Sequence, residues 1–157
     1  MRHKIGAFSL IEVVVAIGVV VAGVAVILAL LPGLLRRTEE AADLQTALRL
    51  PDAVETRLRE EMAGAFPGGM QNGVVLVADK EGTNVRRESQ LNVPPTPAYF
   101  YIDVRSFSSG ELAYQPGRPV LPLRVRVGWP YSAVKAAGNL DSTGNFQLVE
   151  FLVTLSP

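Results

Sequence analysis

The sequence contains no cysteine and only one histidine, His3, in 157 residues. Without cysteine, neither a disulfide framework nor a thiolate metal site can form. His3 lies between Arg2 and Lys4 at the extreme N-terminus, in a position typical of a basic leader. Removal of such a leader would leave no histidine, which excludes Ser-His-Asp hydrolysis, histidine proton shuttling and histidine-ligated zinc in the mature chain.

Charge is also scarce, at 19% of residues, and it is balanced, with 15 basic and 15 acidic side chains. Loss of Arg2 and Lys4 with the leader would leave 13 basic against 15 acidic side chains, a net charge of −2. A nucleic-acid partner would need a clustered basic face, and the sequence has none. The length suits one modest domain with a terminal appendage.

Hydrophobic residues make up 48% of the chain, and their excess is concentrated in residues 8–35. All 19 residues from 13 to 31 are Val, Ile, Leu, Ala or Gly. About 20 such residues cross the about 30 Å of hydrocarbon in a bilayer. A cleaved secretory signal and a buried core helix are the alternatives, but the apolar part of a signal is typically about 7–15 residues. We therefore expect a membrane-spanning helix.

One carboxylate, Glu12, interrupts this apolar segment. An acidic residue in a spanning helix costs up to about 3 kcal/mol at mid-membrane. The many Val, Ile and Leu residues, at about 0.3–0.6 kcal/mol each, outweigh that cost. In one interpretation, Glu12 lies about one turn from the helix start and is simply favoured there by the helix dipole.

The residues around Glu12 also resemble a known processing motif. The run Lys4-Ile5-Gly6-Ala7-Phe8-Ser9-Leu10-Ile11-Glu12-Val13 is similar to the cleavage and methylation motif of type IV pilins and of the pseudopilins of type II secretion. In that family, a membrane-embedded prepilin peptidase removes a basic leader just before a Phe, and the new amino group is N-methylated. The resemblance implies that Phe8 is the first mature residue and that Glu12 neutralises the N-terminal amine of a neighbouring subunit.

Ala7 departs from the family pattern, because the family usually has Gly directly before the cut and Gly6 is one residue earlier. Cleavage after Gly6 would leave Ala7 first and place Glu12 one residue too far. We therefore predict cleavage between Ala7 and Phe8, with N-methylation of Phe8. A carboxylate and an ammonium attract strongly in low dielectric and each is costly there alone, so their pairing between chains would favour assembly.

Pro32 and Gly33 close the apolar run. Proline removes the hydrogen bond to the carbonyl of Leu28, so a helix kink is expected here. Residues 36–66 have helical spacing and predict an amphipathic helix with a solvated charged face, kinked or restarted at Pro51. The expected apolar stripe comprises Leu34, Leu44, Leu48, Val54, Leu58, Met62 and Phe66, and the expected charged face comprises Glu39, Glu40, Asp43, Arg49, Glu55, Arg57, Arg59, Glu60 and Glu61.

Pro67-Gly68-Gly69 is expected to end the helix, because the apolar pattern then changes to alternation. Strands are predicted near residues 74–78, 98–107, 121–129 and 146–155. In the third, Val125 and Val127 share one face while Arg124 and Arg126 point the other way. The expected fold is α+β, with a long N-terminal helix, transmembrane in its first half and amphipathic in its second, packed on a small antiparallel β-sheet. The pilin resemblance implies the same fold.

These patterns divide the chain into a leader (1–7), a transmembrane and assembly helix (8–35), an amphipathic helix that continues into the globular domain (36–66) and a β-sheet region (67–157). No group of residues predicts catalysis, a cofactor or a metal. The loop from Asp141 to Asn145 offers oxygen ligands, but one carboxylate is too few for calcium. The four tyrosines are expected to pack in the core or at its rim; they are Tyr99, Tyr101, Tyr114 and Tyr131.

The resemblance implies a structural subunit of a type IV pilus or type II secretion pseudopilus, not an enzyme. It also implies a single-pass protein of the bacterial inner membrane with a periplasmic globular part, incorporated into a cell-envelope filament. Its partners would be other pilin or pseudopilin subunits, the prepilin peptidase, the inner-membrane assembly platform and membrane lipid. The run Val125-Arg126-Val127-Gly128-Trp129, followed by Phe146 to Thr154, is similar to the small minor pseudopilins and minor pilins. This likeness and the absent disulfide favour a minor subunit. The alternative is a single-pass anchored periplasmic binding module that does not polymerise.

Overall fold

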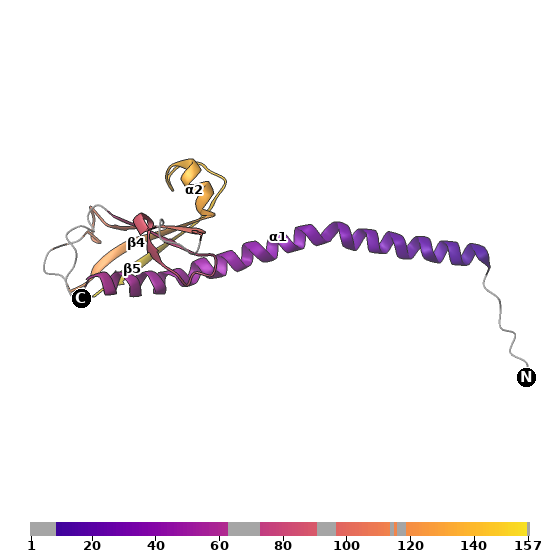
Figure 1. The fold of residues 1–157 in the computed structure, drawn as a ribbon, viewed down its shortest axis with the longest axis horizontal. Coiled ribbons are helices and arrows are strands. Elements are labelled where there is room, and N and C mark those ends of the chain that lie inside the picture. The colour runs from indigo at the N-terminus through magenta and orange to yellow at the C-terminus, as the bar shows by residue number, and fades with distance from the viewer. Residues whose placement is uncertain (1–8, 63–72, 91–96, 114, 116–118, 157) are drawn as a thin grey trace, which may run out of the picture. The chain divides into compact units, whose positions relative to one another are not determined.

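The computed structural model describes residues 9–62, 73–90, 97–113, 115 and 119–156. The expected leader, Phe8, Tyr114 and the expected helix end at Pro67 lie outside these residues. The described elements, seen in Figure 1, are α1 (Leu10–Met62), β1 (Val74–Ala78), β2 (Arg86–Arg87), the 3₁₀ helix η2 (Glu88–Gln90), β3 (Phe100–Ser106), β4 (Leu121–Trp129), α2 (Tyr131–Ala137) and β5 (Gln147–Leu155). The chain divides into two units, Met1–Ala42 and Asp43–Pro157, and α1 has residues in both.

The five strands form one antiparallel sheet in the order β2-β1-β3-β4-β5. The longest pairing joins β4 to β5, from Leu121 opposite Leu155 to Trp129 opposite Gln147. Strands β1 and β4 have the predicted bounds, and β3 and β5 lie within the predicted ranges. The sequence predicted an α+β fold because its apolar residues change from helical spacing to alternation, and the structure confirms that fold.

Within the unit Asp43–Pro157, the last part of α1 packs on one face of the sheet. Its buried apolar residues are Ala47, Leu50, Val54 and Leu58, spaced three and four apart, as one helix face requires. The sheet residues of the same core include Leu76, Phe100, Ile102, Val104, Leu123, Val125, Val127, Trp129, Val153 and Leu155. The alternation of apolar residues along β4 thus marks its core-facing side correctly.

The buried stripe of α1 differs from the predicted one. Leu44 and Leu48, expected to face the core, are 42% and 54% exposed. Asp43, expected on the solvated face, is buried instead. The burial of this carboxylate is compensated, because the Tyr99 hydroxyl donates to Asp43 Oδ2 at 2.5 Å and a paired polar group can enter a core. The predicted buried face of α1 was therefore wrong by one residue at Leu44 and Leu48, where Asp43 and Ala47 are buried instead. Val54 and Leu58 are buried as expected.

Helix α2 was not predicted, and it packs over one end of the sheet, on the face opposite the last part of α1 (Figure 1). Val134 of α2 and Leu140 beyond it are buried against β4. A β-carbon at Gly128 would lie 2.5 Å from Leu140 Cδ2 and 3.0 Å from Val134 Cγ2. The glycine therefore permits the close approach of this segment to β4.

Candidate functional site

The first part of α1 presents an exposed apolar surface. Every residue from 9 to 42 is exposed, and large apolar side chains along it range from Leu31, 40% exposed, to Leu10, 85% exposed. Soluble domains rarely expose contiguous apolar surface on this scale. The exposure argues against the buried-core-helix alternative and indicates that another apolar medium or another protein covers this segment.

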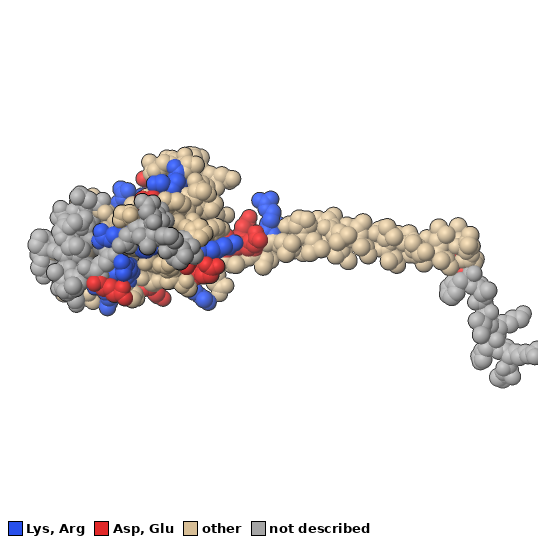
Figure 2. All heavy atoms as spheres, viewed as in Figure 1, with Lys and Arg blue, Asp and Glu red and all other residues tan. Residues whose placement is uncertain are grey.

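The length of the segment suits a bilayer. Residues 10–35 of α1 would extend about 39 Å at 1.5 Å per residue, more than the about 30 Å of hydrocarbon. Charged side chains gather where the apolar run ends, at Arg36, Arg37, Glu39 and Glu40 (Figure 2). A single long apolar helix of this kind is compatible with a single-pass membrane anchor. Helix α1 continues without interruption through Pro32, Gly33 and Pro51, and the kink at Pro32 and Gly33 stays a prediction.

Glu12 lies in the first turn of α1 and contacts Ser9, the residue before the helix. The Ser9 backbone N–H and hydroxyl donate to Glu12 Oε2 at 3.1 Å and 3.2 Å. In return, the Glu12 backbone N–H is 3.3 Å from Ser9 Oγ. This reciprocal arrangement is a capping box, which satisfies N–H groups that the first turn leaves without a helical partner.

The capping box gives Glu12 a local role that sequence reasoning missed. The spacing Ser9-Leu10-Ile11-Glu12 matches the Ser-x-x-Glu signature of such a box, so the sequence contained the signal. The contact agrees with the interpretation that Glu12 is favoured at the helix start. The predicted processing residues Gly6, Ala7 and Phe8 lie outside the described residues.

A second cluster of charged residues lies on the sheet face that α2 covers. Arg126 Nη2 is 2.7 Å from Asp103 Oδ2, and both side chains are almost fully buried. Arg126 Nη1 is 2.5 Å from Asp141 Oδ1, and Arg105 Nε is 3.0 Å from Asp103 Oδ1. Burial lowers the pKa of Arg126, but its hydrogen bonds to Asp141 and Asp103 outweigh burial and hold that pKa above its usual range.

The Arg126 cluster ties the loop after α2 to the sheet. The hydrogen bond from Arg126, followed by the charge of Arg126, lowers the pKa of Asp141. Asn139 Oδ1 also accepts the backbone N–H groups of Asp141 and Ser142, at 2.9 Å and 2.8 Å. The Asp141 carboxylate is thus already engaged. Among the residues that the structure describes, no group of three His, Cys, Asp or Glu side chains could hold a metal ion.

The described tyrosines act as packing and hydrogen-bonding residues at the rim of the core. The Tyr131 hydroxyl donates to Glu88 Oε1 at 3.0 Å, and Lys135 Nζ is 2.9 Å from the same oxygen. Burial raises the pKa of Tyr101 and of Tyr131, and Glu88 adds to both shifts. These contacts join α2 to η2.

Comparisons with protein-family models, with curated proteins and with solved structures found no match for the chain. The fold therefore defines the class of protein at a coarse level: an α+β protein with one long apolar N-terminal helix and a five-stranded antiparallel sheet.

Proposed function

We propose that this protein is a structural subunit of a cell-envelope filament, a type IV pilus or a type II secretion pseudopilus, and that it assembles through its N-terminal helix. The observation that carries the proposal is the exposed apolar segment of α1 with a single carboxylate at its beginning. Such a segment is stable in the inner membrane. A subunit that leaves the bilayer must cover the same surface with the helices of its neighbours, because exposed apolar area is unfavourable in water.

The role proposed for Glu12 follows from the change of surroundings on assembly. At the membrane interface, water solvates the carboxylate, whereas inside a helical bundle it would need a counter-charge. Cleavage between Ala7 and Phe8 by a prepilin peptidase would create an amine near the start of α1. In the filament, the amine of one subunit would pair with Glu12 of the next and select one axial register. We favour a minor subunit. Its globular part would be periplasmic, and the inner-membrane assembly platform would be one of its partners.

A second candidate function is a single-pass anchored periplasmic binding module that does not polymerise. The capping box favours this candidate, because the contacts of Glu12 with Ser9 explain the carboxylate without any neighbour. The two functions differ in what the negative charge of Glu12 does. In the anchored module it is dispensable as long as the helix start remains capped.

Three variants of the full chain separate these functions. Glu12→Gln keeps a side chain that can complete a capping box but removes the charge. Glu12→Ala removes both, and Ser9→Ala removes the two hydroxyl contacts of the box while retaining the backbone N–H contact and the charge. Each variant would be expressed in place of the natural copy, and its amount in membranes and in sheared surface filaments would be measured by immunoblotting.

The filament proposal expects Glu12→Gln and Glu12→Ala to insert and to be processed, but to be depleted from filaments to a similar extent. Ser9→Ala should enter filaments nearly as the natural chain does. Normal incorporation of Glu12→Gln would contradict the role of the charge. Absence of the natural chain from filaments would instead favour the anchored module.

A further inference from the structure

The two edges of the sheet differ in length and charge. At one edge, β2 has only two residues, Arg86 and Arg87. At the other edge, β5 has nine residues, and Glu150 is the only charged one. Among the described residues, no strand pairs with the outer side of β2 or β5. Natural proteins usually protect a long edge strand with Lys, Pro or a bulge, and β5 contains neither Lys nor Pro.

The exposed side of β5 is apolar around its single acid. Leu148 and Leu152 are 44% and 56% exposed, on either side of Glu150. Glu150 lies opposite Arg126 on β4, but the two Nη atoms of Arg126 already contact Asp103 and Asp141. Within the described part of the chain, Glu150 forms no ion pair. On the core-facing side, Val149 and Phe151 are only half-buried and pack at the margin of the core.

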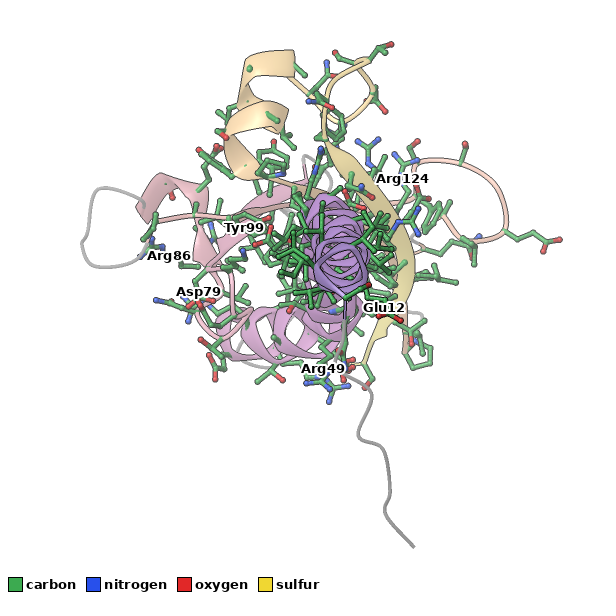
Figure 3. All side chains as sticks on the ribbon, turned by 90° about the vertical axis from the view of Figure 1, so that its right-hand side faces the viewer. Glu12, Arg49, Asp79, Arg86, Tyr99 and Arg124 are labelled. Atoms are coloured by element: carbon green, nitrogen blue, oxygen red, sulfur yellow. The ribbon has the colours of Figure 1, made fainter. Side chains whose placement is uncertain are left out.

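The opposite edge has the complementary charge. Arg86 lies opposite Val77 and Arg87 lies opposite Leu76, so the two guanidinium groups belong to opposite faces of the edge. Figure 3 shows Arg86 and Arg124 toward opposite edges of the sheet, with Arg124 on β4, one strand in from β5. An acidic, apolar edge and a basic edge therefore lie at opposite ends of the strand order.

We propose that β5 of one copy contacts β2 of the next copy, head to tail, in the assembled filament. The inference rests on the proposed function, because subunits that share one orientation need two different complementary surfaces. Four antiparallel pairings separate β2 from β5, so the two strands run in the same direction. Copies that share one orientation would bring β2 of one copy and β5 of the next side by side as a parallel pair. A two-fold contact of β5 with β5 would reverse one copy relative to the other.

The registers of the sheet also specify the offset between copies. Across the five strands, the residues that lie directly beside one another in line with Arg86 are Val77, Tyr101, Gly128 and Leu148. Glu150 is two residues further along β5. A shift of two residues between neighbouring copies, about 7 Å, brings Glu150 opposite Arg86. Successive subunits of a helical filament are displaced from one another, so an offset between neighbouring copies is expected.

Because the chain has no cysteine, introduced pairs report this contact directly. With Glu150 opposite Arg86 in a parallel pair, Leu148 of one copy lies opposite Asn84 of the next. The full chain carrying Asn84→Cys and Leu148→Cys would be recovered in sheared filaments and treated with a short bismaleimide. Within one copy, four strand spacings separate the two edges, about 19 Å, so the short reagent links only different copies.

The expected result is a ladder of covalent dimers, trimers and longer products from the double variant, and no ladder from either single variant. Glu150→Arg in the double-cysteine chain should reduce the ladder at least several-fold, and adding Arg86→Glu should restore it. The fluorescence of Trp129, which is buried in the core, would verify that each variant is folded.

Folded chains that enter filaments but give no ladder would overturn the edge contact while leaving the proposed function intact. Dimers from Leu148→Cys alone would also overturn it, since they would indicate a two-fold contact. Failure of Arg86→Glu to restore the ladder would rule out the predicted register. Absence of the natural chain from filaments would instead refute the proposed function, which the Glu12 variants test separately.

Discussion

Replacement of Arg126 by methionine should destabilise the sheet domain by about 3 kcal/mol. The Arg126 and Asp103 side chains are 6% and 3% exposed, so methionine would fill most of the space but leave the Asp103 carboxylate buried without its main partner. Breaking a buried pair in this way costs about 3–5 kcal/mol. Arg105 still contacts Asp103 at 3.0 Å, which places the expected loss at the low end of that range.

Trp129 provides the assay, because it is the only tryptophan and is 3% exposed in the core. Its fluorescence would follow urea unfolding of the full chain in detergent. The matched control is Arg124→Met, two residues earlier on the same face of β4. Arg124 is half-exposed, so its loss should cost less than about 1 kcal/mol. Equal destabilisation by the two substitutions would refute the argument that Asp103 depends on Arg126.

Three further predictions use the same fluorescence assay. Gly128→Ala should lower the free energy of unfolding by about 1–3 kcal/mol, because the new β-carbon would lie 2.5 Å from Leu140; an unchanged urea midpoint would contradict this. Tyr99→Phe should cost about 1–3 kcal/mol, because it removes the hydroxyl that donates to buried Asp43; a neutral effect would mean that water replaces this hydrogen bond. The hydrogen bond from Arg126 lowers the pKa of Asp141 in the folded chain. The contribution of the Asp141 carboxylate to the free energy of unfolding is therefore complete above the unfolded pKa of about 3.9, and it is lost as pH falls through the lower folded pKa. The urea midpoints of the natural chain and Asp141→Asn should therefore differ at pH 7 and converge in acid, and a difference that persists unchanged would refute the assignment.

The strands were predictable because half-buried strands record their burial in the sequence with a period of two. Val125 and Val127 of β4 face the core as their alternation indicates. The two-residue strand β2 and the seven-residue helix α2 are too short to establish a period, and neither was predicted.

The rotation of α1 could not be predicted from spacing alone. Leu44 and Leu48 are more apolar than Asp43 and Ala47, yet it is the latter pair that is buried. The outcome depends on Tyr99, 56 residues away along the chain from Asp43, and a helical pattern contains no information about a partner so distant. Tertiary context therefore overrode the local hydrophobic pattern.

Part of the candidate site could be predicted from the sequence. The long apolar run predicted a membrane-spanning helix, and the exposed apolar part of α1 is compatible with that prediction. The buried ion pair of Arg126 with Asp103 was not predicted, because Arg126 alternates with apolar residues and has the pattern of a solvated residue. Its burial depends on the β3–β4 register and on the cover that α2 and its following loop provide.

Intact mass and terminal sequencing of the chain recovered from sheared filaments test the central claim most directly. The account predicts a chain that begins at N-methylated Phe8, with Glu12 as its fifth residue. A filament-associated chain that begins at Met1 or at Ala7 would contradict the predicted processing. Filaments without this chain, beside membranes that contain it, would contradict assembly through the helix.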